Sequence, residues 1–318
     1  MSYKDKQRKI QTAKLHYKFP ELFKSDKGFG NYGEYTELMF ILKDGKNNLF
    51  EGIVSDSCAY FNDNDIAWWG DNEKYPTGHL ISSQIQCLNF LFALRKDPDA
   101  VLKLAHLFDA DIEEVLPTLN DSDKGYIAFE FIYENAELLG ETDAGGGRGT
   151  MCTSIDAFII AQRKGKKVLI PIEWKYTEQY ADGTNKALEY RKGITRQYRY
   201  NHLIEKSVQL RDLEDKNRSV YYYEPLYEFM RQTLLVEQMV EKGIADDFLH
   251  VVVVPPGNQD LLSANYSFSD KGLEGMWREV ITDNTKFKLV DSRQIYECIE
   301  KLPLYVELSQ YLRTRYYL

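Results

Sequence analysis

The sequence is poor in cysteine and histidine, and neither residue forms a metal-binding pattern. Its four cysteines are widely spaced without a C-x-x-C pair, and its five histidines include no H-E-x-x-H motif. These absences exclude the usual zinc sites, zinc-hydrolase chemistry and the dense disulfide framework of small secreted domains. We therefore expect the chain to reside in a reducing compartment, the cytoplasm.

Long hydrophobic runs and an excess of basic charge are also missing. Apolar runs such as 251–256 are far shorter than the ~20 residues needed to cross a bilayer. No signal peptide is visible, so we expect no membrane partner. With 40 basic and 49 acidic residues the net charge is −9, so no global positive field attracts nucleic acid. Any binding of nucleic acid has to rest on local features.

The composition that remains is that of a globular chain with a substantial core, since 43% of the residues are hydrophobic and 28% are charged. Three segments rich in aromatic and β-branched residues, 126–133, 153–161 and 166–176, predict consecutive strands. A short turn around Gly165 predicts that the second and third strands form an antiparallel hairpin.

Helical periodicity and capping residues predict the other elements. We expect a helix over 80–94, one or two helices over 98–117, a helix ending near Gly243, a buried strand over 248–256 and a helix over 272–282. The first 79 residues are rich in Gly, Asp and Asn, which predicts a loop-rich region with short strands. The pattern as a whole indicates an α/β fold.

Charged residues interrupt two of the apolar strands. Because side chains alternate along a strand, Glu173 and Lys175 share one face and Trp174 points to the other. Asp156 interrupts the preceding strand, and a hairpin that sets it across from Glu173 brings two carboxylates within reach of one Mg²⁺. The alternative is an ordinary ion pair at a strand edge, with Asp156 as a turn residue.

The segments TSIDA at 153–157 and IEWKYTE at 172–178 resemble the PD-(D/E)xK nuclease superfamily. With SSQ at 82–84, FEF around Glu130 and YYEPLYEFMRQTLL at 222–235, the chain more narrowly resembles a bacterial restriction-endonuclease-like family. Ile155 stands where the superfamily's eponymous Pro would be. The resemblance implies a restriction-endonuclease-like αβββα core with a mixed central sheet flanked by helices. It also implies dependence on Mg²⁺, with Mn²⁺ as a substitute, and cleavage of DNA.

The resemblance also implies roles for individual residues. Asp156 and Glu173 would bind the metal with the main-chain carbonyl of Trp174, and Lys175 would be the catalytic lysine. Glu130 and Gln84 are further catalytic candidates, against the alternatives of a solvent-facing strand position for Glu130 and a capping or surface role for Gln84.

Several polar side chains near these motifs could contact DNA phosphates or stack on bases. These candidates are Arg148, Arg191, Arg196, Arg199, Arg231 and Gln232. The alternative for those after the third strand is a solvated amphipathic helix.

These observations predict a nuclease core over 80–260, an N-terminal elaboration over 1–79 and a C-terminal helical extension over 261–318. The predicted function is a Mg²⁺-dependent DNA endonuclease that hydrolyses phosphodiester bonds with a metal-activated water. The alternative is a catalytically inactive module that keeps the nuclease fold for binding nucleic acid or protein. A homodimer is expected only by analogy with the fold.

Overall fold

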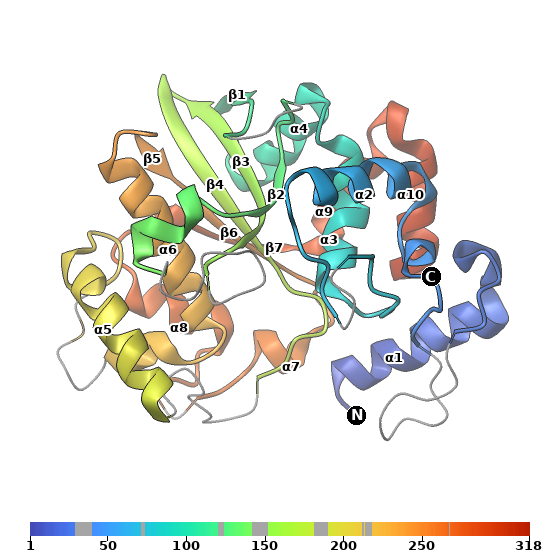
Figure 1. Cartoon of the computed structure of the whole chain (residues 1–318), viewed down its shortest axis with the longest axis horizontal. Helices are drawn as coiled ribbons and strands as arrows, with labels where there is room; N and C mark the ends of the chain where they lie inside the picture. The colour runs from blue at the N-terminus through green and yellow to red at the C-terminus, as the bar shows by residue number, and fades with distance from the viewer. Residues whose placement is uncertain are drawn as a thin grey trace.

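The computed structural model describes residues 1–28, 40–70, 74–119, 124–141, 152–180, 190–211, 213, 218–266 and 268–318, without the side chains of 134–136, 190–193 and 218–219 (Figure 1). Its helices are α1 (Tyr3–Ala13), α2 (Val54–Asp63), α3 (Ser83–Leu91), α4 (Pro98–Phe108), α5 (Tyr190–Lys206), α6 (Leu226–Glu241), α7 (Gln259–Leu262), α8 (Gly272–Val280), α9 (Ser292–Glu300) and α10 (Val306–Leu312). Its strands are β1 (Ile112–Leu116), β2 (Ala128–Phe131), β3 (Ile155–Arg163), β4 (Lys166–Trp174), β5 (Asp247–Phe248), β6 (His250–Val254) and β7 (Phe287–Asp291).

All seven strands belong to one mixed sheet. Its main path runs β1-β3-β4-β6-β7, with β2 also paired to β3 and β5 to β4. The β3–β4 hairpin is antiparallel, as predicted, and turns at Gly165, whose φ of 72° suits a residue without a side chain. The β4–β6 and β6–β7 pairs are parallel.

Helices cover both faces of the sheet, which lies between two helical layers (Figure 1). Along β3, Ala157 and Ile159 pack into the core formed with α2, α3, α4, α9 and α10. Phe158 and Ile160 pack into the opposite core, formed with α5, α6 and α8. This two-residue alternation with both faces buried explains why the strands read as nearly continuous apolar runs. The α/β architecture, a mixed sheet flanked by helices, is therefore confirmed.

Two expectations about local structure were wrong. Residues 112–116 form strand β1 rather than a helix, because Asp109 and Asp111 follow α4 in a turn and the next residues pair with β3. The described part of 1–79 forms α1, α2 and short helical turns, and its one strand-like pairing is the isolated bridge between Ile41 and His79.

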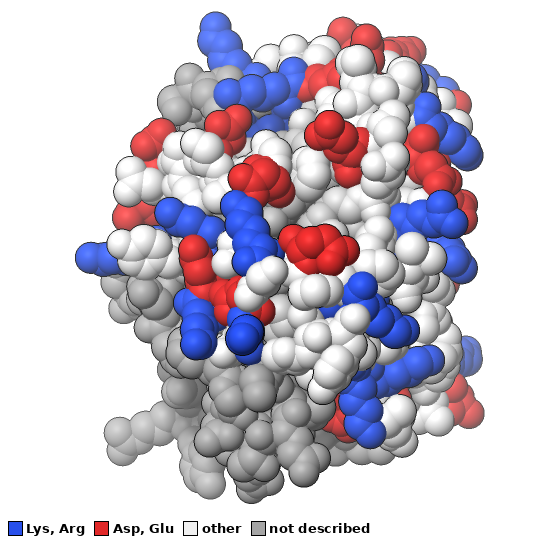
Figure 2. All heavy atoms as spheres, turned by 90° about the vertical axis from the view of Figure 1, so that its right-hand side faces the viewer, with Lys and Arg blue, Asp and Glu red and all other residues white. Residues whose placement is uncertain are grey.

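The chain termini pack against each other. The guanidinium of Arg315 donates to side chains of Gln11 and Asn48, and Asn89 donates to the hydroxyl of Tyr316 at 3.0 Å. The face of the molecule near these ends carries Lys and Arg interspersed with Asp and Glu, without a broad basic surface (Figure 2). None of the helices among the described residues combines the length and apolar character that a bilayer crossing requires.

Candidate active site

Three carboxylates lie side by side on neighbouring strands. Phe129 pairs with Ala157 between β2 and β3, and Ala157 pairs with Ile172 between β3 and β4. One further step of this register sets Glu130 opposite Asp156 and Asp156 opposite Glu173. Residues opposite each other have Cβ atoms about 4.5–5.5 Å apart, so the hairpin brings together the acids that the sequence singled out.

The middle carboxylate, Asp156, is held by the main chain of the next strand. Its Oδ2 accepts the Trp174 N–H at 2.7 Å. Burial raises the pKa of Asp156 well above its usual value, and the charges of Glu173 and Glu130 raise it further against the opposing effects of Lys175 and that hydrogen bond. Carboxylates crowded in this way are stabilised by a cation between them.

The lysine of the E-W-K sequence lies between two carboxylates. Lys175 is 4% exposed, and its Nζ is 2.6 Å from Glu173 Oε1 and pairs also with Glu228 of α6. Burial alone would lower the pKa of Lys175, but the charges of Glu173 and Glu228 outweigh it and the pKa rises well above its usual value. The ammonium is therefore a permanent charge at neutral pH.

Gln232 of α6 lies behind this ion pair rather than at the surface. It is 2% exposed, donates to Glu173 Oε2 and to the Ser154 carbonyl at 3.2 Å, and its Oε1 is 3.1 Å from His250 Nε2. Because burial lowers the pKa of His250 to about 3, the imidazole is neutral and donates to Gln232. The histidine is therefore satisfied within the core, and Gln232 orients Glu173.

Glu130 and Gln84 are also brought together. Gln84 Nε2 donates to Glu130 Oε1 at 2.7 Å, and Ser154 Oγ donates to Glu130 Oε2 at 3.0 Å. Glu130 has a φ of 48°, a left-handed conformation that is uncommon for residues with a side chain and is found where surrounding structure maintains strain, often at functional sites. With Asp156, these residues line a narrow cleft that also contains Cys87.

Cys87 does not supply a nucleophile in this cleft. The residue is 2% exposed. Burial, followed by the charges of Asp156, Glu130 and Glu173, raises the pKa of its thiol well above the usual value. A thiol that stays protonated is a poor nucleophile, so the reactive groups of the cleft are the carboxylates of Glu130 and Asp156.

Three of the arginines predicted to contact DNA lie on α5 and α6, and the structure describes their side chains. The guanidinium of Arg231 lies 4.6 Å from the ring centre of Tyr227, and that of Arg196 lies 5.1 Å from the same ring. Arg199 lies near the ring of Tyr200, at 6.0 Å. These arginines form one cluster where α5 meets α6. Arg148 lies outside the described residues, as does the side chain of Arg191.

A family of proteins described as Restriction Endonuclease associating with ARP matches residues 10–317. The chain belongs to this family. No curated protein and no solved structure matches it. The matched residues include the whole sheet and helices α2 to α10, and the match confirms the restriction-endonuclease-like family that the motifs indicated.

The donor set of this restriction-endonuclease family member suits Mg²⁺ better than a softer metal. Among the described residues no group of three or more His, Cys, Asp or Glu side chains is arranged as a cage that could hold a metal ion. Mg²⁺ needs no such cage, because it is commonly held by one or two carboxylates, waters and substrate phosphates. The oxygen ligands and mutually repelling charges of Asp156 and Glu173 fit that requirement.

Sequence reasoning missed Glu228, the second partner of Lys175. Glu228, Arg231 and Gln232 lie three and four residues apart on α6, so they form a polar stripe on a helix whose other positions are largely buried and apolar. That polar stripe is the sequence feature that could have identified Glu228.

The environment of a further acidic residue, Glu224, should make the stability of the folded protein depend on pH. Its buried Oε2 has no hydrogen-bond partner in the part of the chain that the structure describes. Burial, reinforced by the charge of Glu228, raises the pKa of Glu224 from 4.5 to about 7. The folded state then keeps a proton that the unfolded chain releases, so this residue makes stability fall as the pH rises through that window.

We therefore expect Glu224→Gln to raise the melting temperature at about pH 8 and to change it little at about pH 4, since Gln resembles the protonated acid. Thermal unfolding of both proteins at both pH values is the measurement. An equal difference at the two pH values would contradict the assignment.

Proposed function

We propose that this chain is a Mg²⁺-dependent deoxyribonuclease that hydrolyses phosphodiester bonds in DNA. The observation that carries the proposal is the row Glu130, Asp156 and Glu173 beside the buried Lys175, in a chain that belongs to a restriction-endonuclease family. Paired carboxylates can hold a divalent cation, and the cation and a neighbouring ammonium can both offset the negative charge that develops in phosphodiester hydrolysis.

Asp156 and Glu173 would hold the ion, with the Trp174 carbonyl as a further oxygen ligand. When bound, Mg²⁺ would polarise the scissile phosphate and lower the pKa of the attacking water. The Trp174 N–H and Gln232 hold the two carboxylates through hydrogen bonds.

Lys175 has a defined part in this scheme. Because its pKa is raised, it cannot take a proton from water at neutral pH, and it acts instead as a charged donor. An ammonium in this place can orient the water or offset negative charge in the transition state. Glu228 keeps the ammonium in position if Glu173 turns to the metal.

Incubation of the purified protein with plasmid, linear and single-stranded DNA in Mg²⁺ or Mn²⁺ tests the proposal. We expect the wild type to cleave DNA. Asp156→Ala should lower the cleavage rate by at least about 100-fold, since metal assistance contributes several kcal/mol. Gel electrophoresis measures the products.

The matched control is Glu114→Ala, which removes an exposed carboxylate from β1 and should cleave like the wild type. Absence of cleavage by the wild type, or equal cleavage by Asp156→Ala, refutes the proposal. Calorimetry adds a second readout, because Mg²⁺ binding should disappear in Glu173→Ala.

A further inference from the structure

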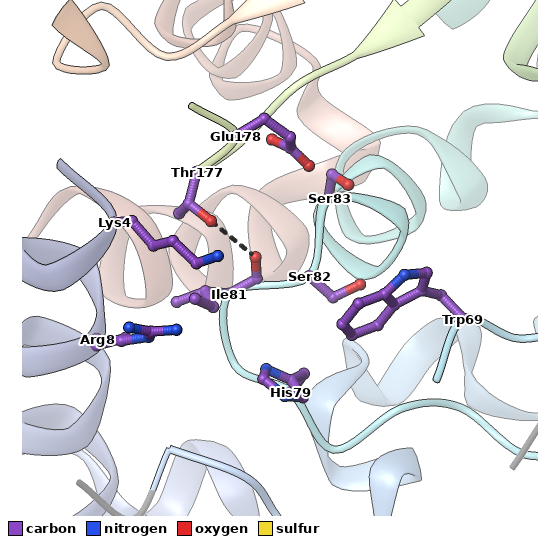
Figure 3. Close-up of a pocket in the computed structure, with 9 residues that line it drawn as sticks. All are labelled: Lys4, Arg8, Trp69, His79, Ile81, Ser82, Ser83, Thr177 and Glu178. Atoms are coloured by element: carbon purple, nitrogen blue, oxygen red, sulfur yellow. Dashed lines mark hydrogen bonds between the residues drawn. The ribbon is translucent and has the colours of Figure 1, made fainter. Parts of the chain in front are cut away.

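A separate cavity of about 370 Å³ opens between α1 and the start of α3 (Figure 3). Such a volume lies near the lower end of the range for small-molecule sites. Its lining is polar and aromatic rather than aliphatic. The lining residues are Lys4, Arg8, Trp69, His79, Ile81, Ser82, Ser83, Thr177 and Glu178.

One side of the cavity is cationic. Lys4 and Arg8 extend from α1 toward its centre (Figure 3). Arg8 Nη1 lies 3.2 Å from Oδ1 of Asp5, three residues earlier on α1, and the guanidinium lies 5.0 Å from the ring centre of Phe40. Within the described ranges no carboxylate pairs with the Lys4 ammonium. An anion of the ligand would supply that counter-charge.

Two buried cations stand behind this wall. Arg315 is fully buried and donates to the Leu80 carbonyl at 3.2 Å, between two residues that line the cavity. Lys14 is 1% exposed and donates to the carbonyls of Thr314 and Arg315. Neither has a carboxylate partner among the residues described, so both add uncompensated positive charge on this side of the cavity.

The opposite side of the cavity is aromatic. Trp69 is 54% exposed, which is unusual for so large an apolar surface. Its ring stands edge-on to the His79 ring, with centroids 5.3 Å apart. An exposed indole across from two cations is the arrangement that binds a nucleobase and its phosphate, because bases stack on aromatic rings and phosphates pair with Lys and Arg.

The cavity adjoins the carboxylate row. The main-chain N–H of Trp69 donates to Gln84 Oε1 at 2.9 Å, and the same amide side chain donates to Glu130. On the other wall, Glu178 follows Lys175 by three residues, which an extended chain covers in at most about 11 Å. One DNA strand can therefore reach both places.

We propose that this cavity binds one unpaired nucleotide of the DNA strand, with its phosphate at Lys4 and Arg8 and its base against Trp69. The inference rests on the proposed function and specifies its substrate: DNA with an unstacked nucleotide next to the scissile bond. A cavity of this size admits a single extruded nucleotide but not a duplex. Glu178, whose side chain faces Ser83 (Figure 3), can accept a hydrogen bond from an amino group on the base.

The test compares a fluorescently labelled duplex that carries one unpaired adenine with the same duplex fully paired. Binding is measured by fluorescence anisotropy in EDTA, so cleavage does not contribute. The wild type should prefer the duplex with the unpaired base. Trp69→Ala should lose that preference, because its affinity for the duplex with the unpaired adenine should fall by about 10-fold or more, as expected for one base–aromatic stack. Tyr75→Ala, which removes a similarly exposed aromatic ring outside the cavity, should retain it.

A second pair of variants tests the phosphate contact. Lys4→Ala should reduce the slope of log affinity against log salt by about one, as expected for loss of one phosphate contact. Lys6→Ala removes an exposed lysine from the same helix and should leave the slope unchanged. Equal preference in Trp69→Ala and wild type, or equal slopes in the two lysine variants, would overturn the proposal.

Cleavage of the same duplexes in Mg²⁺ separates this inference from the nuclease itself. If DNA is cut but Trp69→Ala binds both duplexes like the wild type, the proposed nucleotide site is wrong and the nuclease proposal is supported. If binding depends on Trp69 while no DNA is cut, the nucleotide site stands and the nuclease proposal is wrong.

Discussion

Replacement of Lys175 by Met should lower the rate of DNA cleavage by at least about 100-fold, the loss typical for removal of one preorganised donor from a transition state. The ammonium is held between Glu173 and Glu228 with a raised pKa, so its loss removes the cation that contacts both carboxylates. Cleavage of labelled DNA under single-turnover conditions measures the chemical step.

The same substitution should also destabilise the protein. Removal of one partner from a buried ion pair commonly costs about 3–5 kcal/mol, because the remaining charge is left uncompensated. In Lys175→Met two carboxylates, Glu173 and Glu228, would lie close together without their cation. Added Mg²⁺ should recover part of the lost melting temperature, since the ion would neutralise Glu173.

The double variant Lys175→Met/Glu228→Gln separates the two effects. It removes the charge of Glu228, one of the two carboxylates left without a cation, so stability should return toward that of the wild type while activity stays low. If the double variant regained activity together with stability, Lys175 would be a structural residue and its proposed part in catalysis would be wrong.

The carboxylate row was predictable because it depends on local rules. Alternation along β4 sets Glu173 and Lys175 on one face, and the turn at Gly165 fixes the register that brings Asp156 across from Glu173. The burial of Gln232 was not predictable in this way. It depends on how α6 packs over β4, where Glu173 and His250 satisfy both ends of its amide.

The N-terminal region was misread for a related physical reason. Helix α1 buries Gln7, Arg8 and Gln11 rather than an apolar stripe, and hydrophobic periodicity cannot detect a helix whose buried face is polar. Gln7 and Gln11 are satisfied by residues distant in sequence, and Gln7 accepts a hydrogen bond from the Tyr176 hydroxyl at 3.0 Å. Gln11 contacts Arg315 and the Tyr176 hydroxyl, so the helix is stabilised by tertiary hydrogen bonds.

Arg315 should therefore be among the residues on which stability depends most. It is fully buried, bonds to Gln11, Asn48 and the Leu80 carbonyl, and its guanidinium lies 4.5 Å from the ring centre of Phe23. Arg315→Ala would leave these acceptors unpaired and open a cavity. We expect a loss on the order of 3–5 kcal/mol, measured as a lower midpoint of urea unfolding.

Arg313→Ala is the matched control, because Arg313 lies two residues earlier in the same turn and is exposed. Its unfolding midpoint should stay close to that of the wild type. Arg315→Lys keeps the charge but should still be destabilised, since one ammonium cannot span acceptors that the planar guanidinium reaches together. If Arg315→Lys were as stable as the wild type, charge alone would explain the effect. If Arg315→Ala unfolded at the same urea concentration as Arg313→Ala, this network would not be what joins the two chain ends.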